Sequence, residues 1–377
     1  MNILSLLNGT RDVGECIVKI GGNEISEFYP SLKQTNVALK RKGSAAAELT
    51  FSVLRNGERW PMDSSDQIRT WAQVEIIVVF GDNEEPFFSG YIREISTDVG
   101  DNGNVGTITL TCQDIFSAMD RHCQKVTWDE GRDGLDIISE IIQPYGLSLE
   151  TNLSGLPLDD SHQNLTDFRF IKKLADDNQL EWYLRDHDGG VRKLHLGNVN
   201  SNADTSIPKL LIRAGRATNC LSFNVTFDGY KPDAVRFSTQ PVSGDEVNIE
   251  TTQPDVVLFG NMASDSSASG LDTFEWCLPP ESNTSEQRAE QSAQAQADEN
   301  SFKLKAAGKL DGTVYGALLM PGLVVEVGGA GENDGKWYVD AATHKFDTSG
   351  YFIEFELIRN GAVGNEASSD HILAGVL

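Results

Sequence analysis

The chain has 377 residues and a formal net charge of −25, from 31 Lys+Arg against 56 Asp+Glu. Hydrophobic residues make up 39% and charged residues 23%, near the averages of globular proteins, which excludes wholesale disorder. The acidic balance argues against proteins that grip nucleic acid through its phosphates, because these need clustered Lys and Arg. It also argues against docking on anionic membranes, and no window of about 18 apolar residues predicts a transmembrane helix.

The chain carries five scattered cysteines without a CxxC pair: Cys16, Cys112, Cys123, Cys220 and Cys277. Their odd number argues against a disulfide framework and fits a chain made in a reducing cytoplasm. Cys112, His122 and Cys123 come nearest to a metal cluster, but a fourth ligand is missing, so we expect free thiols and no metal site. The apolar start of the chain lacks a basic leader, so we expect no secretion signal.

Residues 1–126 predict short strands joined by tight turns. Polar and apolar residues alternate at residues 16–20, 47–54 and 106–112, and residues 74–80 form a more fully apolar strand. Gly, Asn and Asp punctuate the segments between these strands. Such a series is typical of an antiparallel barrel or sandwich.

Residues 127–205 show a different pattern, that of a small α+β unit. Apolar residues recur at helical spacing over residues 135–145, where a Pro and a Gly end the run. Thr166 can cap a second helix. Residues 180–185 and 191–196 then predict a β-hairpin.

Strand signals return after residue 206 and are interrupted once. Strands are predicted at residues 208–213, 220–227 and 233–239. A polar region rich in Ser, Gly and Asp follows at about residues 241–280, and it shows few regular signals.

A helix is predicted after this polar region. Thr284 and Gln287 form a capping-box pattern at its start, and Gly308 is a plausible C-cap. The face of this helix is narrow, because it is lined at intervals of four residues by Ala289, Ala293 and Ala297. Such small side chains predict close packing against a neighbouring element.

The last section of the chain repeats the first in outline. Residues 323–327 resemble residues 74–78, and each segment precedes a loop rich in Gly and acidic residues. Each loop then leads to an aromatic strand and an alternating strand. The shared order of four features predicts two β units of one type on either side of the middle block.

Catalytic constellations are missing from the sequence, which has no GxSxG elbow, Walker A loop or HExxH pair. The Gly-rich residues 328–331 lead into a strand rather than a helix, which removes a dinucleotide-binding interpretation. Asp and His residues at 159–162 and 186–188 are typical of solvated turns. Aromatic residues in strands are expected to pack in the core, namely Trp182, Tyr183 and Trp337. We therefore expect no catalytic, cofactor-binding or metal-binding residues.

Two segments resemble a known family. Residues 166–185 contain DFRFIKKLA and then an aromatic strand, which resembles the helix-plus-hairpin segment of the phage late control D family. Residues 335–346 and 350–360 are similar to the closing hairpin of that family, where a G-x-Y-x-V-x-x-x-x-H pattern precedes an alternating strand. Its members are baseplate hub proteins of contractile tails, related to the N-terminal hub part of type VI secretion spike proteins.

The resemblance implies an α+β, mainly β fold with two related antiparallel β-barrel domains, a small α+β middle domain and an insertion. It also implies that three chains assemble as a ring-shaped homotrimer. In this sequence the first barrel would span residues 1–126 and the middle domain residues 127–205. The second barrel would be split between residues 206–240 and residues 312–363. The insertion would span residues 241–311 and the C-terminal tail residues 364–377.

The resemblance implies a function and partners as well. As the structural baseplate hub of a contractile phage tail or tail-like injection particle, the trimer would join the hexameric tail tube to the trimeric central spike. It would leave a channel for DNA or cargo and would contact baseplate wedge proteins and the tape measure protein. We expect no cofactor, no specific nucleic-acid binding and no membrane insertion. The expected location is the tail baseplate of the virion, after assembly in the host cytoplasm.

Alternatives stay open at two points. A tail-associated cell-wall-degrading enzyme is the main alternative to a non-enzymatic hub, and a secreted carbohydrate-binding β protein is disfavoured by the missing signal peptide. At the C-terminus, a short apolar group is a candidate for docking onto the spike or a neighbouring baseplate chain, or forms a frayed end: Ile372, Leu373, Val376 and Leu377.

Overall fold

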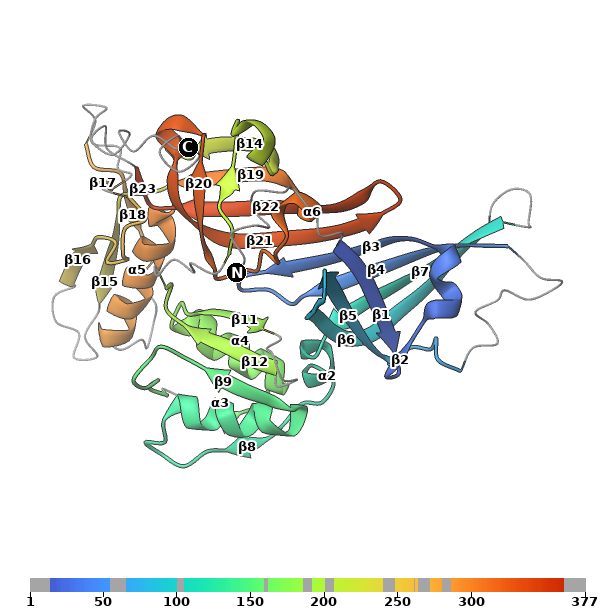
Figure 1. The fold of residues 1–377 in the computed structure, drawn as a ribbon. Coiled ribbons are helices and arrows are strands. Elements are labelled where there is room, and N and C mark those ends of the chain that lie inside the picture. The colour runs from blue at the N-terminus through green and yellow to red at the C-terminus, as the bar shows by residue number, and fades with distance from the viewer. Residues whose placement is uncertain are drawn as a thin grey trace.

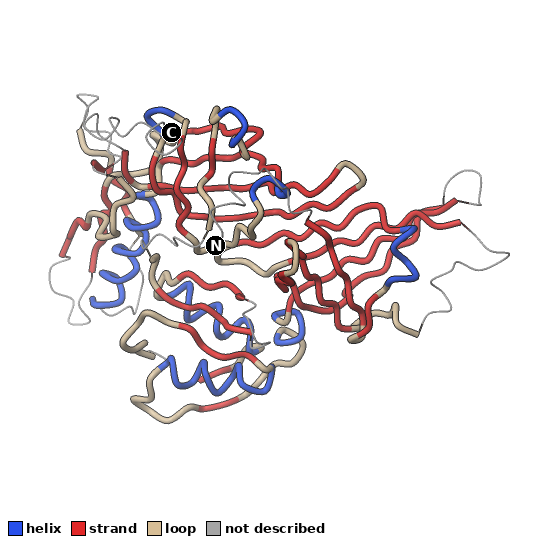
Figure 2. Tube along the Cα trace, viewed as in Figure 1, coloured by secondary structure: helices blue, strands red, loops and turns tan. Residues whose placement is uncertain are grey.

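The computed structural model describes residues 14–54, 66–99, 105–158, 162–185, 192–200, 207–239, 248–260, 262–263, 272–279 and 286–362. A large β-sheet extends across the molecule, with a small α+β unit on one side of it (Figure 1). Strands outnumber helices throughout (Figure 2), which confirms the prediction of a mainly antiparallel β fold of the α+β class. In the described ranges, no helix is both long and apolar enough to cross a membrane.

The N-terminal half of the large sheet is built from hairpins. Along its fourth strand the side chains of Leu49, Phe51 and Val53 alternate into the core, as the sequence pattern predicts. The helical turn η1 (Ser26–Ser31) covers one end. The strands are β1 (Gly14–Ile20), β2 (Asn23–Glu24), β3 (Leu32–Lys40), β4 (Ala46–Leu54), β5 (Gln73–Phe80), β6 (Asn83–Val99) and β7 (Val105–Asp114).

The C-terminal half of the sheet is assembled from segments that are farther apart in the chain. Its one-turn helices are η4 (Gly215–Ala217), α6 (Gly312–Tyr315) and η6 (Gly331–Asn333). Its strands are β13 (Leu210–Leu211), β14 (Cys220–Phe227), β19 (Leu304–Asp311), β20 (Val324–Gly328), β21 (Gly335–Asp347) and β22 (Gly350–Arg359).

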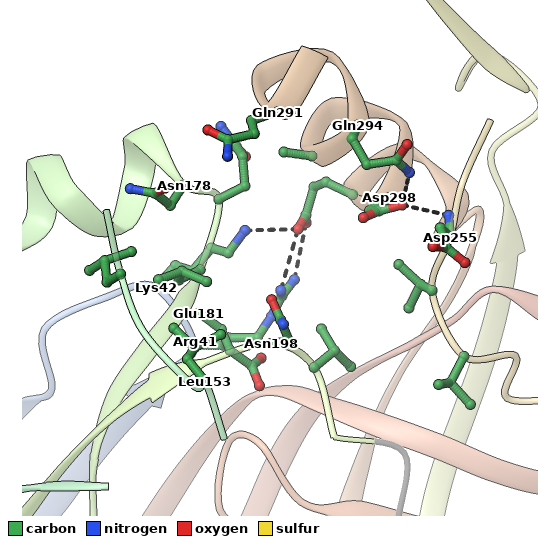
Figure 3. Close-up of a pocket in the computed structure, with 18 of the residues that line it drawn as sticks. Arg41, Lys42, Leu153, Asn178, Glu181, Asn198, Asp255, Gln291, Gln294 and Asp298 are labelled. Carbon is green, nitrogen blue, oxygen red and sulfur yellow. Dashed lines mark hydrogen bonds and ion pairs between the residues drawn. The ribbon is translucent and has the colours of Figure 1, made fainter. Parts of the chain in front are cut away.

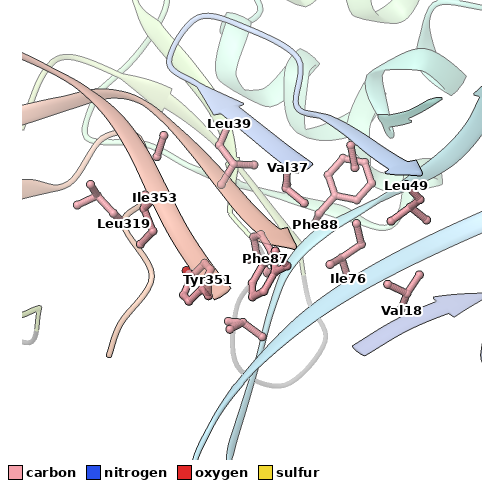
Figure 4. Packing of buried hydrophobic residues seen from close by; sticks show 14 of the residues in the cluster. Val18, Val37, Leu39, Leu49, Ile76, Phe87, Phe88, Leu319, Tyr351 and Ile353 are labelled. Atoms are coloured by element: carbon pink, nitrogen blue, oxygen red, sulfur yellow. The ribbon is translucent and has the colours of Figure 1, made fainter. Parts of the chain in front are cut away.

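The two halves form one sheet, because β3 pairs with β21. The described strands follow the order β14-β19-β22-β21-β3-β4-β7-β6-β5-β1-β2, with β20 and β13 branching from β21. Along this path the sheet stays open, so the two closed barrels of the sequence prediction are not found among the described residues. Both halves contribute to one core, with Val37 and Phe87 from the first half and Tyr351 and Ile353 from the second (Figure 4). In this core Phe87 packs against His344 and Phe346, with ring centroids 5.0 and 6.2 Å apart.

The predicted internal repeat is confirmed by the strand pairing. Repeat 1 has the order β1-β5-β6-β7-β4-β3 and repeat 2 the order β13-β20-β21-β22-β19-β14, so the strands correspond one to one. Two register shifts also correspond, at Ile92/Glu94 and Val339/Ala341 in one pair of strands and at Leu32/Gln34 and Cys220/Ser222 in the other. The repeats differ at their first strands, because β1 pairs antiparallel with β5 whereas β13 pairs parallel with β20, and the shift in β5–β6 has no counterpart in β20–β21. The registers equate Val74 with Val325, two residues away from the alignment suggested by the sequence.

The middle block forms the predicted α+β unit with its own core. Asp133 and Thr166 cap its two main helices, since their side chains accept hydrogen bonds from the backbone N–H groups of Leu135 and Arg169. The elements are α2 (Phe116–Met119), β8 (Val126–Thr127), α3 (Gly134–Ile142), η3 (Gln143–Tyr145), β9 (Leu147–Glu150), β10 (His162–Gln163), α4 (Asp167–Asp177), β11 (Glu181–Arg185) and β12 (Arg192–Gly197). In its three-stranded sheet β12 lies between β11 and β9.

An insertion separates β14 from β19. It comprises β15 (Ala234–Thr239), β16 (Asn248–Thr252), β17 (Met262–Ala263), β18 (Glu275–Cys277) and α5 (Glu286–Ser301), and β17 pairs with β23 (Gly361–Ala362). Ala293 and Ala297 of α5 pack against Val235 and Phe237, as the small helical face predicts. The capping box at Thr284 lies outside the described residues.

The limits of the insertion differ from those expected. β15 pairs with β16 and β18 rather than with the large sheet, whereas β19, expected inside the insertion, pairs with β14 and β22. The prediction of Gly308 as a helix C-cap was wrong, because this residue lies within β19. A Cβ atom there would come within 2.0 Å of the Ser222 carbonyl oxygen and 2.5 Å of the Phe355 ring, so close strand packing requires the glycine.

Candidate functional site

The residues that the sequence singled out for chemistry do not converge on a site. Cys112 is buried in β7, whereas Cys123 is exposed. Among the described residues, no three His, Cys, Asp or Glu side chains are grouped so that they could hold a metal ion. Several other candidates lie outside the described residues, namely the turn at residues 186–188, Asp159 and Asp160. The same holds for the docking candidates Ile372, Leu373, Val376 and Leu377.

The aromatic residues of the predicted strands are core residues. Trp182, Tyr183 and Trp337 are all buried, which confirms their expected packing role. Trp182 stands edge-on to Phe116 with ring centroids 5.3 Å apart and thereby joins α2 to the hairpin of the middle unit.

The histidine of the closing hairpin is also a core residue. His344 is fully buried; its Nδ1 atom lies 2.7 Å from the Tyr351 hydroxyl and its Nε2 atom 3.1 Å from the Leu319 carbonyl oxygen. Burial lowers the pKa of His344 to about 4, so its imidazole is neutral near pH 7. With both nitrogens engaged inside the core, it positions β21 and has no contact with solvent.

A pocket of about 500 Å³ lies where the middle unit, α5 and the turn after β3 meet. Figure 3 shows Arg41 and Lys42 beside α5. Both side chains donate hydrogen bonds to the carboxylate of Glu299 on this helix. The Arg41 Nη2 and Lys42 Nζ atoms each lie 3.0 Å from a Glu299 carboxylate oxygen, and Arg41 Nε lies 2.8 Å from Asp340. The pocket therefore sits beside a network that ties three parts of the fold together.

The charges around the pocket already have partners within the chain. Burial would raise the pKa of Glu299, but the adjacent Arg41 and Lys42 lower it to about 2, so this carboxylate stays ionised. Asp298 accepts hydrogen bonds from the backbone N–H of Asp255 and from the Gln294 side chain, and burial raises its pKa. These groups act as structural links, because their hydrogen-bonding capacity is directed at neighbouring segments.

A second charged cluster joins the middle unit to the large sheet. The Tyr338 hydroxyl donates to Glu181, whose carboxylate oxygens lie 2.6 and 2.5 Å away and whose side chain is almost completely buried. His195 lies between two carboxylates, with Nδ1 3.4 Å from Glu150 and Nε2 3.7 Å from Glu181. Its ring stacks on Tyr183 with centroids 4.6 Å apart.

A histidine between two carboxylates could serve acid–base chemistry, but the surroundings favour a structural role here. Both ring nitrogens of His195 are shielded from solvent. A substrate therefore has no access to them, and a general base must lie within hydrogen-bonding reach of its substrate. The sequence did not reveal this cluster; its only trace was Glu181, an acidic residue directly before the apolar and aromatic residues Trp182, Tyr183 and Leu184.

Exposed apolar side chains mark two edges of the large sheet. Edge 1 is residues 93–99 in the second half of β6, and edge 2 is residues 223–228 at the end of β14 and just beyond it. Exposed fractions are 37% for Ile95, 50% for Val99 and 49% for Phe227, although these side chains point to the same face as the core. The described strands leave both edges without a neighbour on their outer side. Unpaired sheet edges with exposed apolar side chains are suited to binding another chain.

Solved structures with a similar fold include phage tail proteins. The 43 kDa tail protein of prophage MuSo2 from Shewanella oneidensis has 15% sequence identity and a TM-score of 0.66, over 92% of this chain and 98% of that chain. A tail protein from Neisseria meningitidis MC58 has 13% identity and a TM-score of 0.62, over 92% and 97%. At these identities the comparison shows a shared fold.

A component of the type VI secretion system has the same fold. The E. coli c3393 protein, described as structurally similar to the T4 tail proteins gp27 and gp5, has 10% identity and a TM-score of 0.53, over 91% of this chain and 77% of that chain. No curated protein sequence matches the chain. The family model of the Alg8 N-terminal domain matches residues 10–348. The chain therefore belongs to the Alg8 N-terminal domain family.

Proposed function

We propose that the protein is the structural baseplate hub of a contractile phage tail or tail-like injection particle. The observation that carries this proposal is that the large sheet consists of two repeats with the same strand order. Repeats 1 and 2 lie side by side and pair through β3 and β21. A chain with two equivalent units suits an adaptor. Three such chains present six equivalent units, which match a hexameric tube, while the three chains themselves match a trimeric spike. The fold shared with tail proteins supports the same role.

The proposal includes the partners that the late control D resemblance implies. The homotrimer would bind the tail tube protein on one side and the central spike on the other, with wedge and tape measure proteins nearby. The hole of the ring would pass DNA or cargo, and the protein would be located in the baseplate of the virion. The fold shared with a type VI secretion component supports an injection particle in general.

The role would be non-enzymatic. Its support is that the buried charges described above are engaged in joining segments of the chain, as in the Arg41–Glu299 and Tyr338–Glu181 contacts. The test is incubation of the purified protein with peptidoglycan. Release of soluble fragments, abolished by replacing a single carboxylate, would establish the alternative of a cell-wall-degrading enzyme.

The assembly is tested by native mass spectrometry and electron microscopy of the purified protein. We expect a mass close to three times 41.2 kDa and a six-lobed ring with a central hole. A chain that stays monomeric at high concentration would contradict the proposal.

A further inference from the structure

An exposed tryptophan lies on the turn that leads into β5. Trp71 is 38% exposed, and its ring centroid is 6.3 Å from that of Tyr91 on β6. The guanidinium carbon of Arg121, just after α2, lies 4.2 Å from the centre of the Trp71 ring. Arg93 Nη1 donates to the side-chain oxygen of Gln113 at 2.8 Å, and Gln113 pairs with Tyr91 across β6 and β7. Four side chains therefore form one group, the Trp71 cluster: Trp71, Tyr91, Arg93 and Arg121.

The backbone of Trp71 is strained. Its φ angle is 66°, in the left-handed region that bulky side chains rarely adopt. Two backbone hydrogen bonds fix this conformation. The Trp71 N–H donates to the Ile92 carbonyl oxygen at 2.7 Å, and the Ile92 N–H donates to the Ala72 carbonyl oxygen at 3.0 Å. Strain of this kind gathers where proteins contact ligands, and here it holds a large apolar ring at the surface.

The arginines of this region lack acidic partners. Among the residues that the structure describes, no carboxylate forms an ion pair with Arg93, Arg121 or Arg69, an exposed arginine in the turn before β5. By contrast, Arg169 of the middle unit pairs with Asp120. Acidic residues are abundant in a chain with 56 Asp+Glu against 31 Lys+Arg, yet none of those described neutralises these three side chains. Their positive charges are therefore available to an acidic partner.

The chemistry of the Trp71 cluster favours a peptide with acidic side chains over a nucleic acid. Trp, Tyr and Arg are the residue types that dominate the binding energy of protein–protein interfaces. A guanidinium group matches a carboxylate in geometry as well as in charge. A nucleic acid carries a charge on every phosphate and would continue over Glu94 and Asp98, the next charged residues of β6, which are both exposed. A short peptide can place its carboxylates only where the arginines lie.

We propose that the Trp71 cluster binds an acidic peptide segment of a partner protein. An apolar part of the segment packs on Trp71, and its carboxylates pair with Arg93 and Arg121. The surface lies at the junction of repeat 1 and the middle unit, because Tyr91 packs against the core of the middle unit and Arg121 follows α2. A bound segment therefore contacts both parts of the chain. Since the surface belongs to a single chain, the binding requires neither a trimer nor the hub role.

Fluorescence anisotropy with the full chain tests the binding. The probe is a short fluorescent peptide that repeats the triplet Glu-Glu-Leu. Its controls are the same peptide with Gln in place of Glu and a thymidine oligonucleotide of equal length. We expect the acidic peptide to bind at least about tenfold more tightly than either control, and to bind more weakly as the salt concentration rises. Equal binding of the Gln peptide, tighter binding of the oligonucleotide, or no binding of the acidic peptide would overturn the proposal.

Variants assign the binding to the Trp71 cluster. Arg93→Gln and Arg121→Gln change exposed side chains, so both proteins should fold normally, and each should weaken binding about tenfold. Trp71→Ala should also weaken binding, because the apolar contact is lost. Arg216→Gln removes the same charge at an exposed position in η4 and should leave binding unchanged. If Arg216→Gln weakens binding as much as Arg121→Gln, the peptide responds to overall charge and the cluster is not its site.

Discussion

Repeats 1 and 2 share strand order and two bulges, yet at one pair of equivalent positions the large and the small side chain are exchanged between neighbouring strands. In repeat 1 a small residue, Thr35, faces a large one, Leu49, across the β3–β4 pair. In repeat 2 the large residue Phe223 faces Gly308 across the equivalent β14–β19 pair. The two repeats therefore have the same backbone register at this pair of strands, whereas the strand that supplies the larger side chain differs between them.

The exits of the equivalent strands β7 and β22 show the same principle with charge. Asp114 ends β7 and accepts hydrogen bonds from Ser44 Oγ and the Ala45 backbone N–H, at 2.6 and 2.5 Å. The corresponding residue Arg359 ends β22 and donates to the carbonyl oxygens of Gly361 and Asp334. At equivalent positions the chain thus uses an acceptor in one repeat and a donor in the other: Asp114 binds the turn between β3 and β4, whereas Arg359 binds the segments just after β22 and just before β21.

The largest expected effect comes from giving repeat 2 the residue of repeat 1. Gly308→Leu should lower the free energy of unfolding by more than about 3 kcal/mol, because the new side chain collides with the Ser222 carbonyl and the Phe355 ring. Chemical denaturation followed by tryptophan fluorescence measures the loss. Adding Phe355→Leu, which copies Leu110 of repeat 1, should recover part of it.

A neighbouring position supplies the control for this substitution. Ala307→Leu lies one residue earlier in β19 on the exposed side, so we expect a change within about 0.5 kcal/mol. Equal losses for the two variants would show that the glycine is not required by close packing.

A pH-dependent effect is expected from His344, whose counterpart in repeat 1 is Thr97. Burial lowers the pKa of His344 from 6.5 to about 4, so the unfolded chain binds the proton more tightly than the folded one. The stability contributed by the neutral imidazole is complete above pH 6.5 and decreases as the pH falls to about 4. The decrease should amount to about 3 kcal/mol, since one pKa unit corresponds to about 1.4 kcal/mol.

The measurement is the unfolding midpoint in urea at several pH values between 4 and 7. His344→Gln keeps a hydrogen-bonding side chain but does not titrate, so its stability should decrease less over that range. Parallel pH profiles for the variant and the unmodified protein would rule out this assignment.

A smaller effect is expected where the repeats differ in connectivity. A short turn joins β3 to β4, whereas the whole insertion separates β14 from β19, and Arg41 in the turn binds Glu299 at the end of the insertion. Arg41→Ala should lower the free energy of unfolding by about 2 kcal/mol, less than for a fully buried pair because the Glu299 side chain is 41% exposed.

Limited proteolysis locates the effect of this change. The Arg41→Ala protein should be cut faster within the insertion, while cleavage of the middle unit stays unchanged. Arg216→Ala, at an exposed position in η4, serves as the matched control. Unaltered cleavage of the insertion would mean that the ion pair does not hold it in place.

The sequence predicted those elements whose local signals agree with their final contacts. The helix α4 has a Thr166 cap and apolar residues at helical spacing, and it forms where expected. The strand β19 was missed because its sequence, LKAAGKLD, has few β-favouring residues; pairing with β14 and β22 on both sides makes it a strand. Local propensity could not indicate this.

The functional surfaces were harder to predict than the fold. The Glu181–Tyr338 contact joins residues 157 positions apart, so no local pattern could reveal it. Edges 1 and 2 were recognised as strands, but whether a strand lies inside a sheet or at its edge depends on the pairing order. The repeat was visible from the order of features, although only its bulges fixed which residues correspond.

The smallest effect on the repeats is expected from removing the C-terminal residues 364–377, which follow the last strand of the described chain. Because the strands of both repeats lie before this segment, the oligomeric state in native mass spectrometry and the thermal unfolding should be unchanged. Binding to the central spike should weaken if Ile372, Leu373, Val376 and Leu377 dock there, and a pull-down with the spike protein of the same particle measures this. A variant with these four residues changed to Ser separates the loss of apolar contacts from the loss of chain length. Undiminished spike binding by both variants would assign adaptor contacts to the repeats alone.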